Sequence, residues 1–255
     1  MTGKAFFDKI YGREKICPAI FPSKEKNAMI PASLSAEFDT LIVLDTETTG
    51  VDPKSHRIIE LAAARIGKGA RPDAPEETMD LFIRLPDGEK IPPEIVSLTG
   101  ITDERLLCEG VAEEEAARQF AKLFTGGKTL VVAYNAQFDL CFLYYFLLRH
   151  GMTDLLRNLR FLDALTVYRD RRSYPHKLAN AVEEYRLCTQ NTHRAIDDTL
   201  AAAELLAKMA EEKDDLLRYV NLFGYSKKYG ISGQRISSIT YRPQGYDPLR
   251  PLYEN

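Results

Sequence analysis

The stretch VLDTETTG, residues 43–50, places two acids at the end of an apolar run. The preceding residues, FDTLIVL, are typical of a buried strand. Because successive side chains of a strand alternate between its two faces, Asp45 and Glu47 share one face. Burial and a like charge nearby both raise the pKa of a carboxyl group, unless a cation lies between the two acids. The stretch therefore predicts either a cation site on a buried strand or a strand end whose acids are solvated.

Length and composition limit the class of protein. A chain of 255 residues suits one large domain, with or without extensions. Its 34 Lys and Arg against 37 Asp and Glu give a net charge of -3, so any polyanion partner has to be held locally. The four cysteines lie far apart without a CxxC pair, which argues against a zinc site or a disulfide framework. We find no secretory signal and no apolar run of about 20 residues, so we expect a cytoplasmic protein with no membrane partner.

The order of predicted elements indicates an α/β fold. Strands are expected at 40–46, 57–67 and 79–85, joined by short turns as in an antiparallel meander. A helix over 112–124, a strand over 129–135, a helix over 137–151, and then a short strand with further helices follow. This pattern predicts a mixed sheet flanked by helices. Residues 1–37 show no sustained period and are predicted to be an N-terminal extension.

Two basic stretches each leave two interpretations open. From residue 225 onward, tyrosines alternate with lysines and arginines, which suits either stacking on nucleic-acid bases or packing of the tail on its own domain. The stretch YRDRRSYPHK, residues 168–177, is predicted to be a loop that either contacts phosphates or is solvated.

Two further acids are predicted to face inward. Asp139 shares the apolar stripe of its helix with Phe142, Leu143 and Phe146, so it either caps the helix or serves a site. In HRAIDD, residues 193–198, helical phase distinguishes the two aspartates. Positions four, seven and eleven residues after Asp198 are apolar, whereas those after Asp197 are half charged, so Asp198 is expected to face inward.

The start of the same helix holds His193, which is either a local hydrogen-bonding residue or a proton acceptor. Asn191 or Thr192 is a candidate N-cap. Four inward carboxylates repel one another unless divalent cations lie among them, and oxygen ligands favour Mg²⁺ or Mn²⁺. Two such ions about 4 Å apart suit in-line displacement at phosphorus, with a histidine to accept the proton of the attacking water. Phosphodiester hydrolysis is the chemistry that this set fits best.

Three ordered motifs, DTETTG, YNAQFD and HRAIDD, resemble those of the DEDDh exonucleases. That family includes the proofreading epsilon subunit of bacterial DNA polymerase III and the proofreading insert of the Gram-positive replicative polymerase. The resemblance covers about residues 38–210, including the accessory stretches HRIIELAA and IPPEIVSLTGITDERL. It implies a ribonuclease H-like fold. It also implies site roles: metal ligands Asp45, Glu47, Asp139 and Asp198, general base His193, and contacts to the 3′-terminal nucleotide from Thr48, Leu98 and Thr99. The chain departs from the family at Tyr134, where a histidine is usual.

The resemblance implies an exonuclease domain over 38–212, followed by a helix end and a Tyr-rich basic tail over 213–255. We expect a metal-dependent 3′–5′ exonuclease that releases 5′-mononucleotides from single-stranded DNA 3′ ends, in proofreading or repair. An RNA exonuclease of the same family is the close alternative, because discrimination depends on how a pocket meets the 2′-hydroxyl. A module that binds a DNA polymerase or clamp through its extensions is the alternative from another class.

Overall fold

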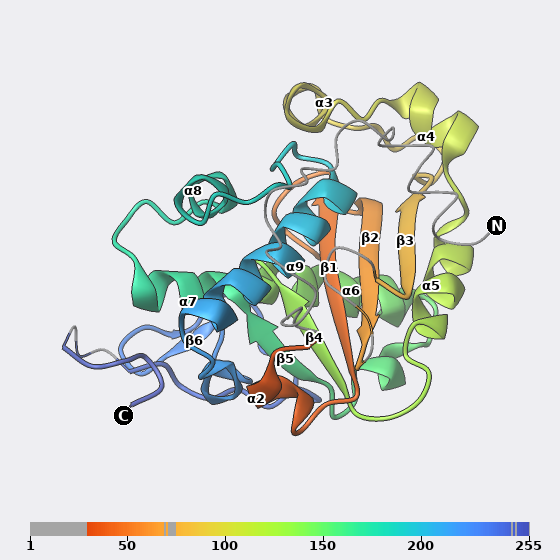
Figure 1. The fold of residues 1–255 in the computed structure, drawn as a ribbon. Coiled ribbons are helices and arrows are strands. Elements are labelled where there is room, and N and C mark those ends of the chain that lie inside the picture. The colour runs from red at the N-terminus through yellow and green to blue at the C-terminus, as the bar shows by residue number, and fades with distance from the viewer. Residues whose placement is uncertain (1–29, 69, 71–74, 246, 248, 255) are drawn as a thin grey trace.

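The computed structural model describes residues 30–68, 70, 75–245, 247 and 249–254. Its main feature is a five-stranded mixed sheet with the order β3-β2-β1-β4-β5 (Figure 1). The first three strands pair antiparallel, whereas β4 pairs parallel with β1 and β5 parallel with β4. The strands are β1 Thr40–Thr48, β2 Ile58–Gly67, β3 Glu77–Phe82, β4 Thr129–Ala133 and β5 Arg160–Asp163. The predicted antiparallel meander and mixed sheet are confirmed.

Helices cover both faces of the sheet (Figure 1). The side chains of β1 alternate between these layers: Leu41 and Val43 lie in the core under α7, α8 and α9, and Ile42 and Leu44 lie in the core under α5 and α6. The α-helices are α2 Ala32–Ser35, α3 Pro93–Thr99, α4 Asp103–Glu109, α5 Glu113–Lys122, α6 Ala136–Arg149, α7 Ala164–Arg171, α8 Leu178–Glu184 and α9 Ala195–Glu212. Short 3₁₀ helices η1 and η2 span Thr153–Leu156 and Leu216–Tyr219.

Several element ends differ from the predicted bounds. β1 continues to Thr48, so both acids of the first motif lie within the strand. β3 ends at Phe82 because the next residues change partner: the amide of Arg84 donates to the carbonyl of Val111 at 2.9 Å. β4 ends at Ala133, and Asn135 has a left-handed backbone with φ of 72° that starts α6.

Helices α3 and α4 were not predicted. They form within the stretch IPPEIVSLTGITDERL, where Pro93 is the first residue of α3 and Thr102 Oγ1 accepts a hydrogen bond from the amide of Arg105 to cap α4. A small separate core, which includes Ile59, Phe82, Ile91, Ile101 and Leu106, packs this pair of helices on the ends of β2 and β3. The apolar residues of these short helices are too few to give a clear helical period.

The prediction that residues 168–177 form a loop was wrong for the first four of them, which belong to α7. Arg169 and Arg171 belong to α7 rather than to a loop, and Arg171 donates to the carbonyls of Met209 and Lys213 and to Asp215 Oδ1. Arg172 pairs with Glu184 and Glu212. Arg171 and Arg172 therefore join α7 to α8 and to the end of α9 and do not lie on a solvated loop. At the departure from the family, Tyr134 Oη donates to the carbonyl of His176 at 2.7 Å.

The C-terminal tail packs on the same cores as the sheet. Tyr241 lies in the core under α6, and Tyr253 lies in the core under α7 and α9. Strands β6 Tyr225–Ser226 and β7 Gly230–Ile231 form a short hairpin. Of the two interpretations of the tail, packing on its own domain is confirmed for these tyrosines, whereas Tyr246 lies outside the described residues.

At the other end of the chain, the predicted extension is described from residue 30 onward. There Ile30 and Leu34 are buried in the core under α9, and residues 1–29 lie outside the described part. Among the helices of the described residues, none is both long enough and apolar enough to cross a membrane.

Candidate active site

β1 presents its two acids to the layer of α9. Asp45 and Glu47 continue the face of Leu41 and Val43, and both remain partly exposed while the rest of the strand is buried. The prediction that the two acids share a face is consistent with this alternation. Small residues on β2 let α9 approach closely: Ala62 packs directly against the first turns of that helix.

Asp139 reaches the same place from the opposite layer. It lies in the first turn of α6 and is 3% exposed. Thr46, which points toward α6 between the two acids of β1, donates through Oγ1 to Asp139 Oδ1 at 2.8 Å. The N-cap position of α6 belongs to Asn135, so the inward orientation, rather than capping, accounts for Asp139. The site therefore forms where the end of β1 is reached from both layers.

α9 supplies the fourth acid. Asp198 is 7% exposed and Asp197 is partly exposed, which confirms the choice made from helical phase. Asn191 Nδ2 donates to Asp198 Oδ2 at 2.6 Å, and the amide of Thr192 donates to Asp198 Oδ1 at 3.3 Å. The prediction that Asn191 or Thr192 is the N-cap was wrong. Arg194 holds that position, because the segment before the helix bends to hold the aspartate.

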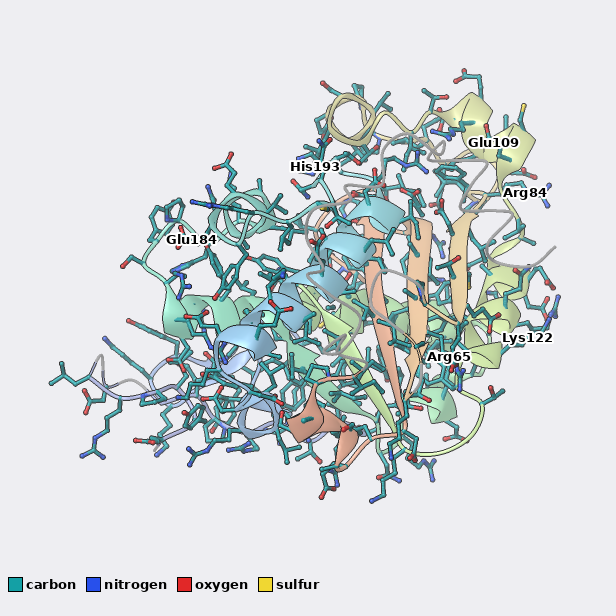
Figure 2. All side chains as sticks on the ribbon, viewed as in Figure 1. Arg65, Arg84, Glu109, Lys122, Glu184 and His193 are labelled. Atoms are coloured by element: carbon teal, nitrogen blue, oxygen red, sulfur yellow. The ribbon has the colours of Figure 1, made fainter. Side chains whose placement is uncertain are left out.

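The predicted histidine lies beside two of these acids. One ligand atom each from Glu47, His193 and Asp198 lie within 4.8 Å of one another. His193 itself is exposed and has a left-handed backbone with φ of 57°. Figure 2 shows it at the start of α9, near one end of the sheet. Its ring is therefore accessible from solvent while it borders the carboxylates.

An arginine next to this histidine neutralises a fifth acid, which the sequence did not single out. Glu60 of β2 lies directly opposite Glu47 of β1, an arrangement that repels like charges. Arg194 donates to Glu60 Oε1 from Nε at 2.9 Å and from Nη2 at 2.6 Å, and the amide of Ala195 donates to Oε2 at 3.1 Å. Glu60 is completely buried. The available signal was one acid inside an apolar strand, but its partner lies 134 residues away.

The four predicted ligands have no comparable partner. In the described part of the chain, Arg194 forms salt bridges with Glu60 and Asp80, and no Lys or Arg forms one with Asp45, Glu47, Asp139 or Asp198. Burial raises the pKa of Asp45 well above its usual range, and the acids around it, Asp139 first, raise it further. Burial and the charge of Asp198 raise the pKa of Glu47 to about 8, although Arg194 opposes the shift.

The other two acids are shifted in the same direction. Burial raises the pKa of Asp139 to about 7, against the lowering effect of the hydrogen bond from Thr46. Burial also raises the pKa of Asp198 to about 6, against the lowering effect of Asn191. A crowded set of carboxylate oxygens whose charges lack a cation from the chain fits a hard divalent ion, because such ions prefer oxygen ligands.

The three residues predicted to contact the substrate differ in how much of the side chain is available to a nucleotide. Thr48 Oγ1 donates to the carbonyl of Gly50 at 2.6 Å, and Thr99 Oγ1 donates to that of Ile95 at 2.9 Å, so both hydroxyls already have partners. Leu98, on α3, is 52% exposed. It is the one of the three that presents a large apolar surface.

Comparison with known proteins agrees with this fold. The RNase T family model, described as exonuclease, matches residues 42–206. The PolC-type DNA polymerase III of Halalkalibacterium halodurans is 31% identical over 240 residues, which are 91% of this chain and 16% of the polymerase. That of Clostridium perfringens is 34% identical over 185 residues, 69% of this chain and 12% of the polymerase. The chain thus spans only a small part of these relatives.

Solved structures share the fold at lower identity. Zinc-bound E. coli exonuclease I in complex with single-stranded DNA matches with a TM-score of 0.62 and 21% identity, covering 71% of this chain and 42% of that one. Exonuclease I of Methylocaldum szegediense matches with a TM-score of 0.61 and 22% identity, covering 71% and 42%. With the family match extending over residues 42–206 and all three motifs in order, the chain belongs to the exonuclease family, in its histidine-containing DEDD branch.

Proposed function

We propose that this protein is a metal-dependent 3′–5′ exonuclease that removes 5′-mononucleotides from the 3′ end of single-stranded DNA. The observation that carries the proposal is the group of four carboxylates with raised pKa values and no Lys or Arg partner among the described residues, bordered by His193. In an exonuclease-family chain, such a set is suited to binding divalent cations next to a phosphodiester.

The proposed ligands are Asp45, Glu47, Asp139 and Asp198, which would hold two Mg²⁺ or Mn²⁺ ions. When bound, these ions supply Lewis-acid stabilisation of the attacking and leaving oxygens of the displacement at phosphorus. Thr46 fixes the carboxylate of Asp139, and Asn191 fixes that of Asp198. Both acids are therefore oriented before an ion or a substrate arrives.

His193 is the proposed general base. Its position beside Glu47 and Asp198 lets an imidazole nitrogen accept the proton of the attacking water at neutral pH. Its exposure allows the proton to pass on to solvent. Thr48, Leu98 and Thr99 remain the proposed contacts of the 3′-terminal nucleotide, and among them Leu98 has the apolar surface to pack on a sugar or base.

Substrate, partner and location are supported by the relatives. Similar curated proteins are DNA polymerases, and the matching exonuclease I structures include a complex with single-stranded DNA. These favour DNA over RNA, a DNA polymerase as a partner, and a cytoplasmic location. A clamp is proposed as the alternative partner. An RNA exonuclease of the same family remains the second candidate. A role restricted to binding a polymerase is disfavoured, because a binding module has no use for four converging acids.

Digestion of matched oligonucleotides tests reaction, direction and sugar together. DNA and RNA single strands labelled at either end are incubated with Mg²⁺, Mn²⁺ or EDTA. We expect stepwise shortening from the 3′ end of DNA with metal, with no shortening in EDTA or for Asp45→Ala. Asp154→Ala, which alters an exposed acid on η1, is the matched control and should retain full activity. Absence of metal-dependent release from every substrate would refute the proposal.

A further inference from the structure

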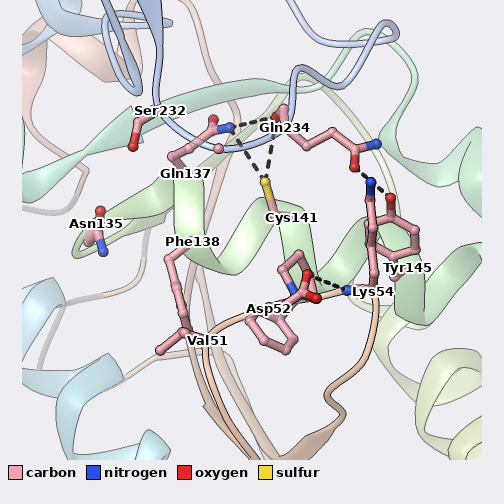
Figure 3. Close-up of a pocket in the computed structure, with 13 residues that line it drawn as sticks. Val51, Asp52, Lys54, Asn135, Gln137, Phe138, Cys141, Tyr145, Ser232 and Gln234 are labelled. Carbon is pink, nitrogen blue, oxygen red and sulfur yellow. Dashed lines mark hydrogen bonds between the residues drawn. The ribbon is translucent and has the colours of Figure 1, made fainter.

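A groove of about 870 Å³ lies along α6 (Figure 3). Its α6 wall starts at Asn135 and Phe138, immediately before Asp139, and ends at Tyr145. The loop that follows β1, including Val51 and Lys54, forms a second wall. The groove is therefore lined by Asn135 and Phe138 of the second motif, and its second wall begins with the residue that follows the first motif.

The third wall, Ser232–Gln234, comes from the C-terminal segment, beyond the last residue matched by the family model. It is fixed to α6: Gln137 Nε2 donates to the carbonyl of Gln234 at 2.8 Å, and Tyr145 Oη donates to Gln234 Oε1 at 2.5 Å. Nearby, Ile236 is buried in the core under α6. This wall is a built part of the fold and a feature of this chain in addition to the family domain.

The lining suits a single strand of nucleic acid. Phe138 is partly exposed and provides an aromatic face on which a base can stack. The amides of Asn135 and Gln234 and the hydroxyl of Ser232 offer neutral polar groups. Lys54, exposed in the second wall, adds a positive charge. Asp52 is the acid in the lining, and its carboxylate accepts hydrogen bonds from the amide of Lys54 and the hydroxyl of Ser55.

The groove also has a suitable length. The ten residue steps from Asn135 to Tyr145 rise about 15 Å along a helix, which corresponds to roughly four nucleotides at the stacked spacing of about 3.4 Å. We propose that this groove binds the nucleotides on the 5′ side of the scissile bond, and that the Ser232–Gln234 wall makes the enzyme prefer longer strands to dinucleotides. The proposal rests on the proposed exonuclease function.

Filling the groove tests it. Ser232→Trp places a large side chain at an exposed position of the third wall, and Ser237→Trp makes the same change at an exposed position of the same segment that does not line the groove. For the unaltered protein and the control variant, kcat/KM with a ten-nucleotide strand should exceed that with a dinucleotide at least about tenfold, the scale of one lost base stack. Ser232→Trp should raise KM for the longer strand and so remove this preference.

Binding provides a readout that does not depend on catalysis. Fluorescence anisotropy of a ten-nucleotide strand with a nuclease-resistant 3′ linkage, measured in Ca²⁺, should show about tenfold weaker binding by Ser232→Trp than by Ser237→Trp. Thermal unfolding verifies that both variants are folded. Equal binding by the two, or an unchanged length preference, overturns the groove proposal. If the unaltered protein hydrolyses no strand but the binding difference is present, the proposed catalytic function fails and the groove proposal stands.

Discussion

Two kinds of acid lie near one another at the ends of β1 and β2. Glu60 is completely buried, and Arg194 and the amide of Ala195 satisfy its carboxylate. Asp45 lies on the adjacent strand, and every major influence on its pKa, from burial to the neighbouring acids, disfavours its charged form. The chain thus supplies its own cation for Glu60, and we propose that an ion from solution neutralises the others. The pairing of Arg194 with Glu60 stabilises the fold, and the unpaired acids suit catalysis.

The largest expected effect is on activity. Asp45→Asn removes a proposed metal ligand and should lower the rate of nucleotide release about a thousandfold or more, as loss of an essential catalytic group does. Because it also removes a charge that other carboxylates repel, the variant should unfold at a higher temperature than the unaltered protein in EDTA. Activity within tenfold of the unaltered protein would exclude Asp45 from the proposed metal site.

The opposite effect on stability is expected at Glu60, the acid that pairs with Arg194. Arg194→Met leaves the charge of Glu60 buried without a cation, and should lower the free energy of unfolding by about 3–5 kcal/mol. The measurement is urea denaturation. Adding Glu60→Gln should recover most of the loss, because the neutral amide needs no cation. As a control, Arg118→Met breaks an exposed salt bridge with Glu114 and should cost at most about 1 kcal/mol. A similarly small cost for Arg194→Met would contradict the distinction drawn between the two kinds of acid.

The pH dependence of stability should separate the two groups next. Folding raises the pKa of Asp139 to about 7 and that of Glu47 to about 8, above their ordinary values, so the folded metal-free protein binds more protons than the unfolded chain. The stability that this contributes is present below about pH 4 and is lost as the pH rises through 7 to 8. We expect the free energy of unfolding in EDTA to fall by something on the order of 3 kcal/mol between about pH 4 and pH 8. The measurement is urea denaturation at a series of pH values. A rise in the free energy of unfolding over the same pH range would contradict the raised pKa values.

Metal addition should give the smallest of these effects. Mn²⁺ at 100 times its dissociation constant should raise the free energy of unfolding by about 2.7 kcal/mol, because it binds the folded state alone. The measurement is the shift in thermal unfolding at pH 7.5, compared with Ca²⁺-free buffer containing EDTA. The shift should be largely absent from Asp45→Asn and retained by Asp154→Ala. An unaltered protein that shows no shift with Mn²⁺ or Mg²⁺ would lack the proposed ion site.

Local periodicity predicted a large part of the candidate site. Strand alternation assigned Asp45 and Glu47 to one face, and helical phase selected Asp198 over Asp197, because both rules depend only on neighbouring residues. The contacts that orient these acids were not predictable in the same way. Asn191 is a residue type that often caps helices, but its side chain bonds to Asp198 instead. A side-chain partner here competes with the backbone amides that an N-cap would bond.

The sequence by itself determined the order of the strands and the longer helices, the membership of the exonuclease family, and the choice of Asp198 over Asp197 as the inward acid. These depend on composition, period and motif order. Only the tertiary structure decided which charges are neutralised. Arg194 contacts Glu60 across 134 residues of chain, and Thr46 contacts Asp139 across 93. Gln234 contacts Tyr145 of α6 across 89 residues. Such pairs form because packing of the layers brings distant residues together, and no local pattern encodes their distance or orientation.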